Sequence, residues 1–228
     1  MKKKTLIITI TSVFVLAAII TLLIFVFSGN PTADVKSVNL NGTWKVAAQF
    51  SNDSASLPEN EFMVFTDDTA TAHRDGAAIA TSKYEFSNGT NLKLPDISRE
   101  YTVERKTDNH IRFYESAAVY MDLIRYPNDD LSTAPVDTAK LYGKWNVTYR
   151  NSATPIADEV ICFTETEIED YRGDSANPAA VSAYSWSSPD TLFAEKWGTQ
   201  YQLIQFADNT IFFIEKPSGL VWELTKAS

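Results

Sequence analysis

The stretches LNGTWKV (residues 40–46) and LYGKWNV (residues 141–147) place the same Gly-x-Trp pattern among apolar residues at two points of the chain. When the sequence is laid on itself with this offset, aromatic, apolar and charged positions match along both segments. The matched pairs include Phe65 with Phe163, Arg74 with Arg172, Tyr84 with Tyr184, Phe86 with Trp186, Tyr101 with Tyr201, Phe113 with Phe213 and Glu115 with Glu215. So many matches in one alignment indicate an internal duplication of one structural unit.

Within each copy, apolar residues recur at every second position. In the first copy the apolar series Trp44, Val46, Ala48 and Phe50 alternates with Thr43, Lys45, Ala47 and Gln49. This period predicts half-buried strands with one apolar face and one face in water. Turn-forming pairs such as Asp75-Gly76 and Asn88-Gly89 separate the strands.

The pattern predicts about eight strands in each copy; in the first they cover residues 42–50, 61–66, 69–74, 80–86, 91–95, 100–106, 110–115 and 119–126. Eight short antiparallel strands joined by tight turns can close into an up-and-down barrel, which leaves no exposed sheet edge. We therefore predict an all-β protein with two tandem eight-stranded barrels. They occupy residues 38–126 and 139–228, joined by a linker with two prolines at residues 127–138.

The first 29 residues have the composition of a membrane anchor. Lys2, Lys3 and Lys4 precede an uncharged, mostly apolar run, residues 5–27, which reaches the roughly 20 residues that span a bilayer. The run is longer than the apolar part of a cleavable signal peptide, which is the alternative. We predict a single-pass transmembrane helix with a cytoplasmic N-terminus, followed by a stem at residues 30–37. Both barrels then lie outside the cytoplasm, at a bacterial cell surface.

A Gly-x-Trp on the first strand of an eight-stranded barrel resembles the lipocalins, and more closely the small bacterial lipocalin-like domains. The resemblance implies that the tryptophan closes the narrow end of the barrel and that a basic residue near the end of the copy packs across its ring. The residues that carry these barrel-closing roles are Gly42, Trp44 and Arg125 in the first copy and Gly143, Trp145 and Lys226 in the second. The chain departs from full lipocalins in its short loop after the first strand and in the absence of a C-terminal helix pattern.

The sequence contains little that indicates catalysis. The net charge of −9 disfavours nucleic acid as a partner, and the single cysteine, Cys162, excludes an internal disulfide and is predicted to be a core residue. His73 and His110 lie beside predicted turns and are expected at the surface. Alternating acids on one strand are interpreted as a solvated outer face and not as a calcium site, namely Glu165, Glu167, Glu169 and Asp170. We predict no catalytic residue, no metal and no cofactor.

Two functions remain open from the sequence. The first is a membrane-anchored binding protein that holds a small apolar or amphipathic ligand at a barrel mouth without catalysis. The alternative is a solid-cored surface module that recognises a protein or an envelope component. The predicted ligand or partner contacts are Tyr84, Phe86, Tyr184, Trp186 and Trp197, and Trp222 also distinguishes the second copy because Met121 stands at its place in the first. An interior void of a few hundred cubic ångströms favours the ligand.

Overall fold

The computed structural model of the chain describes residues 38–52, 54–128, 131, 134–151, 156, 158–207, 209–216 and 218–227. Residues Val38–Ser228 form one compact unit. The predicted tail, anchor and stem at residues 1–37 lie outside the described residues. Within the described ranges, no helix has the length and hydrophobicity to cross a membrane.

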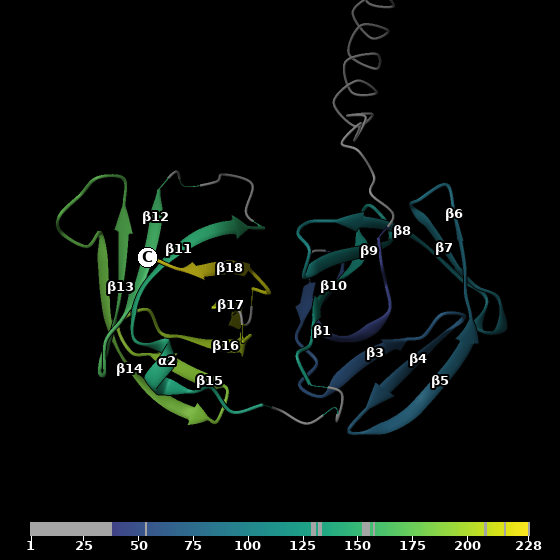
Figure 1. Cartoon of the computed structure of the whole chain (residues 1–228), viewed down its shortest axis with the longest axis horizontal. Coiled ribbons are helices and arrows are strands. Elements are labelled where there is room, and N and C mark those ends of the chain that lie inside the picture. The colour runs from purple at the N-terminus through teal and green to yellow at the C-terminus, as the bar shows by residue number, and fades with distance from the viewer. Residues whose placement is uncertain are drawn as a thin grey trace, which may run out of the picture. The chain divides into compact units, whose positions relative to one another are not determined.

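The second copy is a closed barrel of eight antiparallel strands, in which every strand pairs with the next and the last pairs with the first (Figure 1). The strands are β11 (Gly143–Arg150), β12 (Glu159–Phe163), β13 (Glu167–Arg172), β14 (Ala180–Ser188), β15 (Thr191–Ala194), β16 (Thr199–Gln205), β17 (Thr210–Lys216) and β18 (Val221–Lys226). A single helical turn, α2 (Thr138–Leu141), precedes β11, and the Asp137 carboxylate caps it by accepting from the Ala139 amide. The predicted eight-stranded barrel is confirmed for this copy.

The first copy forms a ten-stranded sheet in the order β5-β4-β3-β1-β10-β9-β8-β7-β6, with β2 paired to β1. Its elements are β1 (Gly42–Ser51), β2 (Ser54–Ser56), β3 (Glu61–Phe65), β4 (Thr69–Arg74), β5 (Ala77–Lys83), β6 (Glu85–Ser87), β7 (Asn91–Leu94), the 3-10 turn η1 (Pro95–Ile97), β8 (Arg99–Arg105), β9 (His110–Ser116) and β10 (Val119–Arg125). The two ends of the sheet, β5 and β6, are consecutive strands separated by Tyr84 alone. The sheet therefore wraps into a barrel, as Figure 1 shows.

The prediction of eight strands and full closure was wrong for the first copy, and the reason is a strand that changes partners. β5 pairs only with β4, and β6 only with β7. In the second copy β14 divides in the same way, since residues 180–183 pair with β13 and residues 184–188 with β15. At the change of partner the Tyr84 amide donates to the Asp68 carbonyl and the Tyr184 amide to the Thr166 carbonyl. The two copies thus share one strand order, and among the described residues the break at Tyr84 sets the first apart from the closed second barrel.

Each barrel has its own apolar core, filled by the inward residues of the period-two pattern. Trp44, Leu92 and Phe113 are fully buried in the first barrel, and Trp145 and Leu192 are fully buried in the second. Cys162 is half-buried and lies between the inward Ile161 and Phe163, so the prediction of a core cysteine was wrong.

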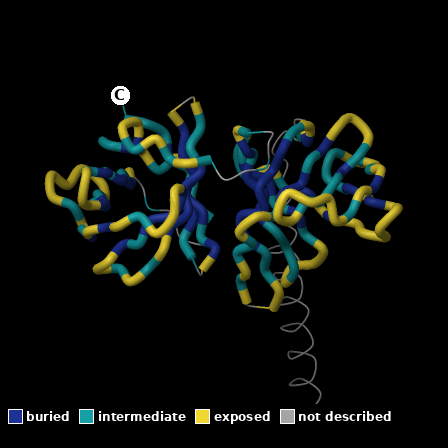
Figure 2. Tube along the Cα trace, turned by 90° about the horizontal axis from the view of Figure 1, so that it is seen from below, coloured by how far each residue is buried: buried dark blue, intermediate teal, exposed yellow. Residues whose placement is uncertain are grey.

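A third buried cluster lies between the barrels and comes from the outer faces of strands in both copies. Its buried members are Ala47, Phe62, Ile124 and Tyr126 from the first copy and Ile204, Phe212, Ile214 and Val221 from the second. The face of β1 that was predicted to be wet is covered here, because Thr43, Lys45 and Ala47 are only 4%, 2% and 1% exposed. Figure 2 shows buried segments, in dark blue, where the two barrels face each other, and exposed segments, in yellow, around the outer edges of both. The error arose because alternation identifies two faces of a strand and does not show what covers the second one.

The contact between the barrels contains a buried polar network around Asp122. Its carboxylate accepts from Arg112 Nε at 2.7 Å and Nη2 at 2.8 Å, and it lies 3.0 Å from His110 Nε2. His110 was predicted at the surface but is fully buried, with the rings of Tyr149 and Phe212 from the second copy packed against it. Burial favours the neutral acid, but the hydrogen bonds from His110 and Arg112 outweigh it and hold the pKa of Asp122 below its usual value.

Candidate functional site

One end of each barrel is closed by a buried indole. Trp44 and Trp145 are both 1% exposed, and each indole N–H donates to a carbonyl four residues earlier, at Leu40 and Leu141, over 2.6 and 2.7 Å. The Arg125 guanidinium carbon and the Lys226 Nζ each lie 4.5 Å from the centre of the indole in their own copy. This end of each barrel is the floor.

The basic residue of each floor also binds the chain that enters the barrel. Arg125 donates to the carbonyls of Asn39 and Asn41, both at 3.0 Å, and Lys226 donates to the carbonyls of Lys140 and Tyr142. Gly42 and Gly143 have φ angles of +116° and +113°, and a Cβ on Gly42 would lie 3.1 Å from Arg125 Nη1. A side chain at either glycine would meet both backbone strain and the cation. The floor leaves a ligand to approach from the opposite end.

Both opposite ends, the mouths, hold a cavity. The first mouth has a volume of about 420 Å³. It is lined by aromatic and hydroxyl side chains, among them Phe50, Ser51, Ser54, Tyr101, Phe113 and Tyr120, and by the ion pair of Arg99 with Glu115 at 2.5 Å. The second has a volume of about 310 Å³ and combines aromatic residues with charged ones, among them Tyr201, Phe213, Trp222, Arg150, Glu159 and Asp170. Both volumes fall in the range of small-molecule sites.

The second mouth contains an inward-facing charged cluster. Arg150 Nη1 lies 3.2 Å from Glu159 Oε1, and Arg172 Nη2 lies 2.7 Å from Asp170 Oδ2. Glu159 is 4% exposed and Asp170 6%. The Arg150 guanidinium carbon also lies 4.9 Å from the centre of the Trp222 ring. The sequence interpretation found no inward polar cluster and placed Asp170 on a solvated outer face, and the structure overturns both points.

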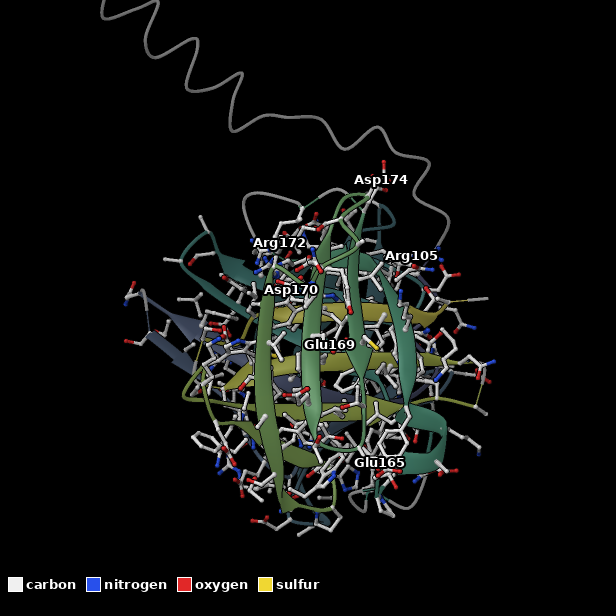
Figure 3. All side chains as sticks on the ribbon, turned by 90° about the vertical axis from the view of Figure 1, so that its left-hand side faces the viewer. Arg105, Glu165, Glu169, Asp170, Arg172 and Asp174 are labelled. Carbon is white, nitrogen blue, oxygen red and sulfur yellow. The ribbon has the colours of Figure 1, made fainter. Side chains whose placement is uncertain are left out.

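β13 shows how its acidic residues divide between the two faces. Ile168 and Asp170 are buried and share the inward face, whereas Glu167 is exposed and Glu169 is half-buried, with its carboxylate accepting from the Tyr171 hydroxyl at 2.8 Å. Figure 3 shows Asp170 and Arg172 towards one end of the barrel and Glu165 at the other. The period-two rule could have found Asp170, because it lies two positions after an inward isoleucine. Of the described residues, no group of three or more His, Cys, Asp or Glu side chains could hold a metal ion.

Three buried polar atoms of this cluster have no hydrogen-bond partner among the described residues: Arg150 Nε, Asp170 Oδ1 and Trp222 Nε1. Two are donors and one is an acceptor. Buried groups of this kind normally find a partner, and leaving one unpaired costs about 1–3 kcal/mol.

The strand register shows what is particular to the second mouth. Glu61 pairs with Arg74 as Glu159 pairs with Arg172, and Gln49, Ala72 and Met121 of the first copy stand at the positions of Arg150, Asp170 and Trp222. In the first copy Glu61 accepts from Gln49 Nε2 at 3.0 Å and from Arg74 Nε at 2.7 Å, so one arginine faces it. All three residues with unpaired atoms are therefore substitutions between the copies.

Charge and burial change the acidity of the groups at the second mouth. Burial raises the pKa of the Glu159 carboxyl, although Arg150 opposes the shift. Burial also raises the pKa of the Tyr201 hydroxyl, and Glu215, to which it is hydrogen-bonded, adds to that shift. Tyr201 therefore stays neutral at physiological pH and acts as a donor.

The five predicted aromatic contacts do not gather at one site. Trp197 lines the second mouth and packs edge-on against Tyr201 at 6.1 Å between ring centres. Tyr84 and Phe86 line a separate pocket of about 220 Å³ beside the floor of the first barrel. Tyr184 is buried and donates to the Thr164 carbonyl at 2.8 Å, and Trp186 packs against its ring at 6.1 Å.

Comparisons with known proteins add nothing to the fold beyond what the strand order of the structure shows. No protein-family model and no curated protein sequence matches the chain. A lipocalin-like protein from Bacteroides uniformis ATCC 8492 is similar over 38% of this chain and 98% of its own, with 15% identity and a TM-score of 0.32. A protein of unknown function from the DUF3598 family of Nostoc punctiforme PCC 73102 is similar over 85% of this chain and 99% of its own, with 9% identity and a TM-score of 0.25. Such low TM-scores carry no argument about function.

Proposed function

We propose that the chain is a binding protein that holds a small amphipathic molecule at a barrel mouth without catalysis, and that the mouth of the second barrel is its principal site. The observation that carries this proposal is a cavity of about 310 Å³ whose lining combines aromatic rings with two ion pairs, Arg150 with Glu159 and Arg172 with Asp170. The aromatic wall of Tyr201, Phe213 and Trp222 accounts for the apolar part of the ligand, because such rings bury large apolar area.

The membrane location belongs to the same proposal. It is supported by the apolar run at residues 5–27 and the lysines that precede it. A barrel held outside the cytoplasm by one helix would meet small molecules at the cell envelope. Protease treatment of intact cells that removes the barrels would support this placement, and full protection of the barrels would contradict it.

The alternative, a solid-cored interaction module, has less support. Both mouths reach the few hundred cubic ångströms that favour a ligand. The large hydrophobic residues exposed in the described part of the chain are Ile79 and Ile97, at 54% and 39%. Two such side chains fall short of the extended apolar patch that a protein interface requires.

Native mass spectrometry of the full chain, purified from its own host, tests the proposal. We expect a bound mass on the unmodified chain and its loss in Arg150→Gln or Trp222→Met, which restore the residue types of the first copy. Arg105→Gln is the matched control, because Arg105 lies at the floor end of β8, away from both mouths. If the unmodified chain carries no bound mass, or if the control loses it equally, the proposed site is wrong.

A further inference from the structure

We infer, building on the proposed binding function, that the second mouth selects an organic cation with one ammonium group and a compact apolar body. Three differences between the copies lead to this ligand class. One changes the charge of the mouth and two change its aromatic wall. They are Thr199 in place of Arg99, Trp197 in place of Ile97 and Trp222 in place of Met121.

The cavity of the second mouth has more carboxylates than arginines. Its described lining contains three carboxylates and two arginines, and each arginine is already in an ion pair with a carboxylate of its own. The third carboxylate belongs to Glu215, whose hydrogen-bond partners are the neutral hydroxyls of Tyr201 and Ser218. An anion would add to this excess of negative charge, whereas a cation would compensate it.

The first mouth has the same carboxylate and pairs it with a cation from the chain. Glu115 stands at the position of Glu215, and its Oε1 lies 2.5 Å from Arg99 Nη1. The register of β15 and β16 places Thr199 where β7 and β8 place Arg99. The second mouth therefore lacks the guanidinium that faces this carboxylate in the first. An ammonium group of a ligand would take the place of that arginine.

The aromatic wall of the second mouth also suits a cation. Both mouths contain a tyrosine and a phenylalanine, and the described lining of the second adds two tryptophans. Indole is the aromatic ring that attracts cations most strongly. Trp222 already has the Arg150 guanidinium carbon 4.9 Å from its ring centre. Trp197, which replaces Ile97, is half-buried and packs edge-on against Tyr201 at 6.1 Å, so it offers a second indole to a ligand.

The size of the cavity and the charge of the chain limit the ligand further. A cavity of about 310 Å³ stands at the lower end of the range for small-molecule sites. A body of one aromatic ring or a branched chain fills such a space, and a long acyl chain would extend beyond it. The net charge of −9 also raises the concentration of cations near the protein.

Isothermal titration calorimetry of the full chain tests the inference with three probes of similar shape. They are phenethylamine, 2-phenylethanol and 3-phenylpropionate, which are cationic, neutral and anionic at neutral pH. Nanodiscs of an uncharged glycolipid hold the chain, so that the lipid brings no ammonium group. We expect phenethylamine to bind at least about tenfold more tightly than 2-phenylethanol, since a hydrogen bond to a charged group is worth about that factor. The anion should bind most weakly.

Variants that exchange residues between the copies locate the contact. Thr199→Arg places an arginine beside Glu215, and it should weaken phenethylamine binding about tenfold while leaving 2-phenylethanol unchanged. The reciprocal change, Arg99→Thr, should release Glu115 and add a weaker second site for phenethylamine in the first mouth. Thr102→Arg is the matched control, because it adds the same charge at an exposed position of β8 that lines neither mouth.

The outcomes separate the ligand class from the binding function. Should Thr199→Arg fail to fold, Glu215→Gln supplies the same test, with loss of the preference for phenethylamine over 2-phenylethanol. Equal or tighter binding of 2-phenylethanol or 3-phenylpropionate by the unmodified chain would overturn the organic cation and keep the proposed function. An equal effect of Thr102→Arg would overturn the contact with Glu215. Absence of binding by every probe would overturn the cation, and absence of a bound mass from the host as well would overturn both.

Discussion

The floors of the two barrels are nearly identical, whereas their mouths differ. Each floor has a glycine with positive φ, a buried indole and a cation 4.5 Å from the ring centre. At the mouths, the register places Arg150 where the first copy has Gln49, and Trp222 where it has Met121. A duplicated chain keeps in both copies what the fold requires, and the differences between copies mark what is particular to one. At the mouth of the second barrel those differences include the charged residues Arg150 and Asp170.

The outer faces of the barrels also differ, because different strands of the two copies are buried where the barrels meet. Lys45 on β1 is 2% exposed, whereas its counterpart Asn146 on β11 is exposed. Phe212 and Ile214 on β17 are buried, whereas Arg112 and Tyr114 at the corresponding positions of β9 are half-buried. The barrels therefore meet through different faces, so that the contact between two related units is not symmetric.

The largest expected loss of stability comes from removing the floor tryptophans, and it tests whether the two floors are equivalent. Trp44→Ala and Trp145→Ala should each lower the free energy of unfolding by about 3–5 kcal/mol, because each removes a fully buried indole and leaves a cavity. Urea denaturation followed by circular dichroism measures this loss. Trp197→Ala, a half-buried residue at the second mouth, is the control and should cost clearly less. If one floor variant cost little while the other unfolded the protein, the floors would not be equivalent.

The second expected effect concerns the asymmetric contact between the barrels. Asp122→Ala should cost about 3 kcal/mol, because Arg112 and His110 lose their buried acceptor. Glu100→Ala is the control. The Glu100 side chain is 59% exposed and its Oε1 lies 3.9 Å from Lys93 Nζ, and such a surface ion pair contributes about 0–1 kcal/mol to stability. A loss below about 1 kcal/mol for Asp122→Ala would show that water reaches the network and that the barrels separate readily.

Much of this fold could be predicted from the sequence, since inward residues repeat with period two and turn residues punctuate the strands. The contact between the barrels was missed because alternation was read on one face at a time. A signal was present: Ile211, Phe212, Phe213 and Ile214 are four apolar residues in a row, which is typical of a strand buried on both faces. The first copy reads Ile111, Arg112, Phe113 and Tyr114 there.

The candidate site was predicted only in part. The sequence comparison identified Trp222 as a difference between the copies, and Trp197 lies at the same mouth. Arg150 and Asp170 were not identified, because polar residues on strands were assigned to the wet face by type. Which of two polar neighbours points inward depends on the register, and a bulge between Val147 and Tyr149 shifts the register of β11 before Arg150. That shift is a property of the folded sheet.

The smallest expected effect is a pH dependence that only the first copy should have. Burial lowers the pKa of Lys45 from 10.5 to about 8, and Lys216 adds to this shift while Asp190 and Glu59 oppose it. Between pH 8 and 10.5 the unfolded chain therefore binds more protons at this residue than the folded chain does, so the free energy of unfolding contributed by Lys45 rises with pH. Below pH 8 both states are protonated and the full cost of the buried charge is present.

Comparison with Lys45→Met isolates this contribution. From pH 8 to 9.5 the free energy of unfolding of the unmodified chain should rise by about 1.5 kcal/mol relative to the variant, at up to about 1.4 kcal/mol per pH unit. At pH 7 the variant should be at least as stable, because an apolar side chain replaces a buried charge. Tyrosines with raised pKa values act in the opposite direction near pH 10, but they are common to both proteins and cancel in the difference. Asn146→Lys, which places a lysine at the exposed counterpart position of the second copy, should add no such slope relative to the unmodified chain, and an added slope of equal size would mean that the two outer faces are buried alike.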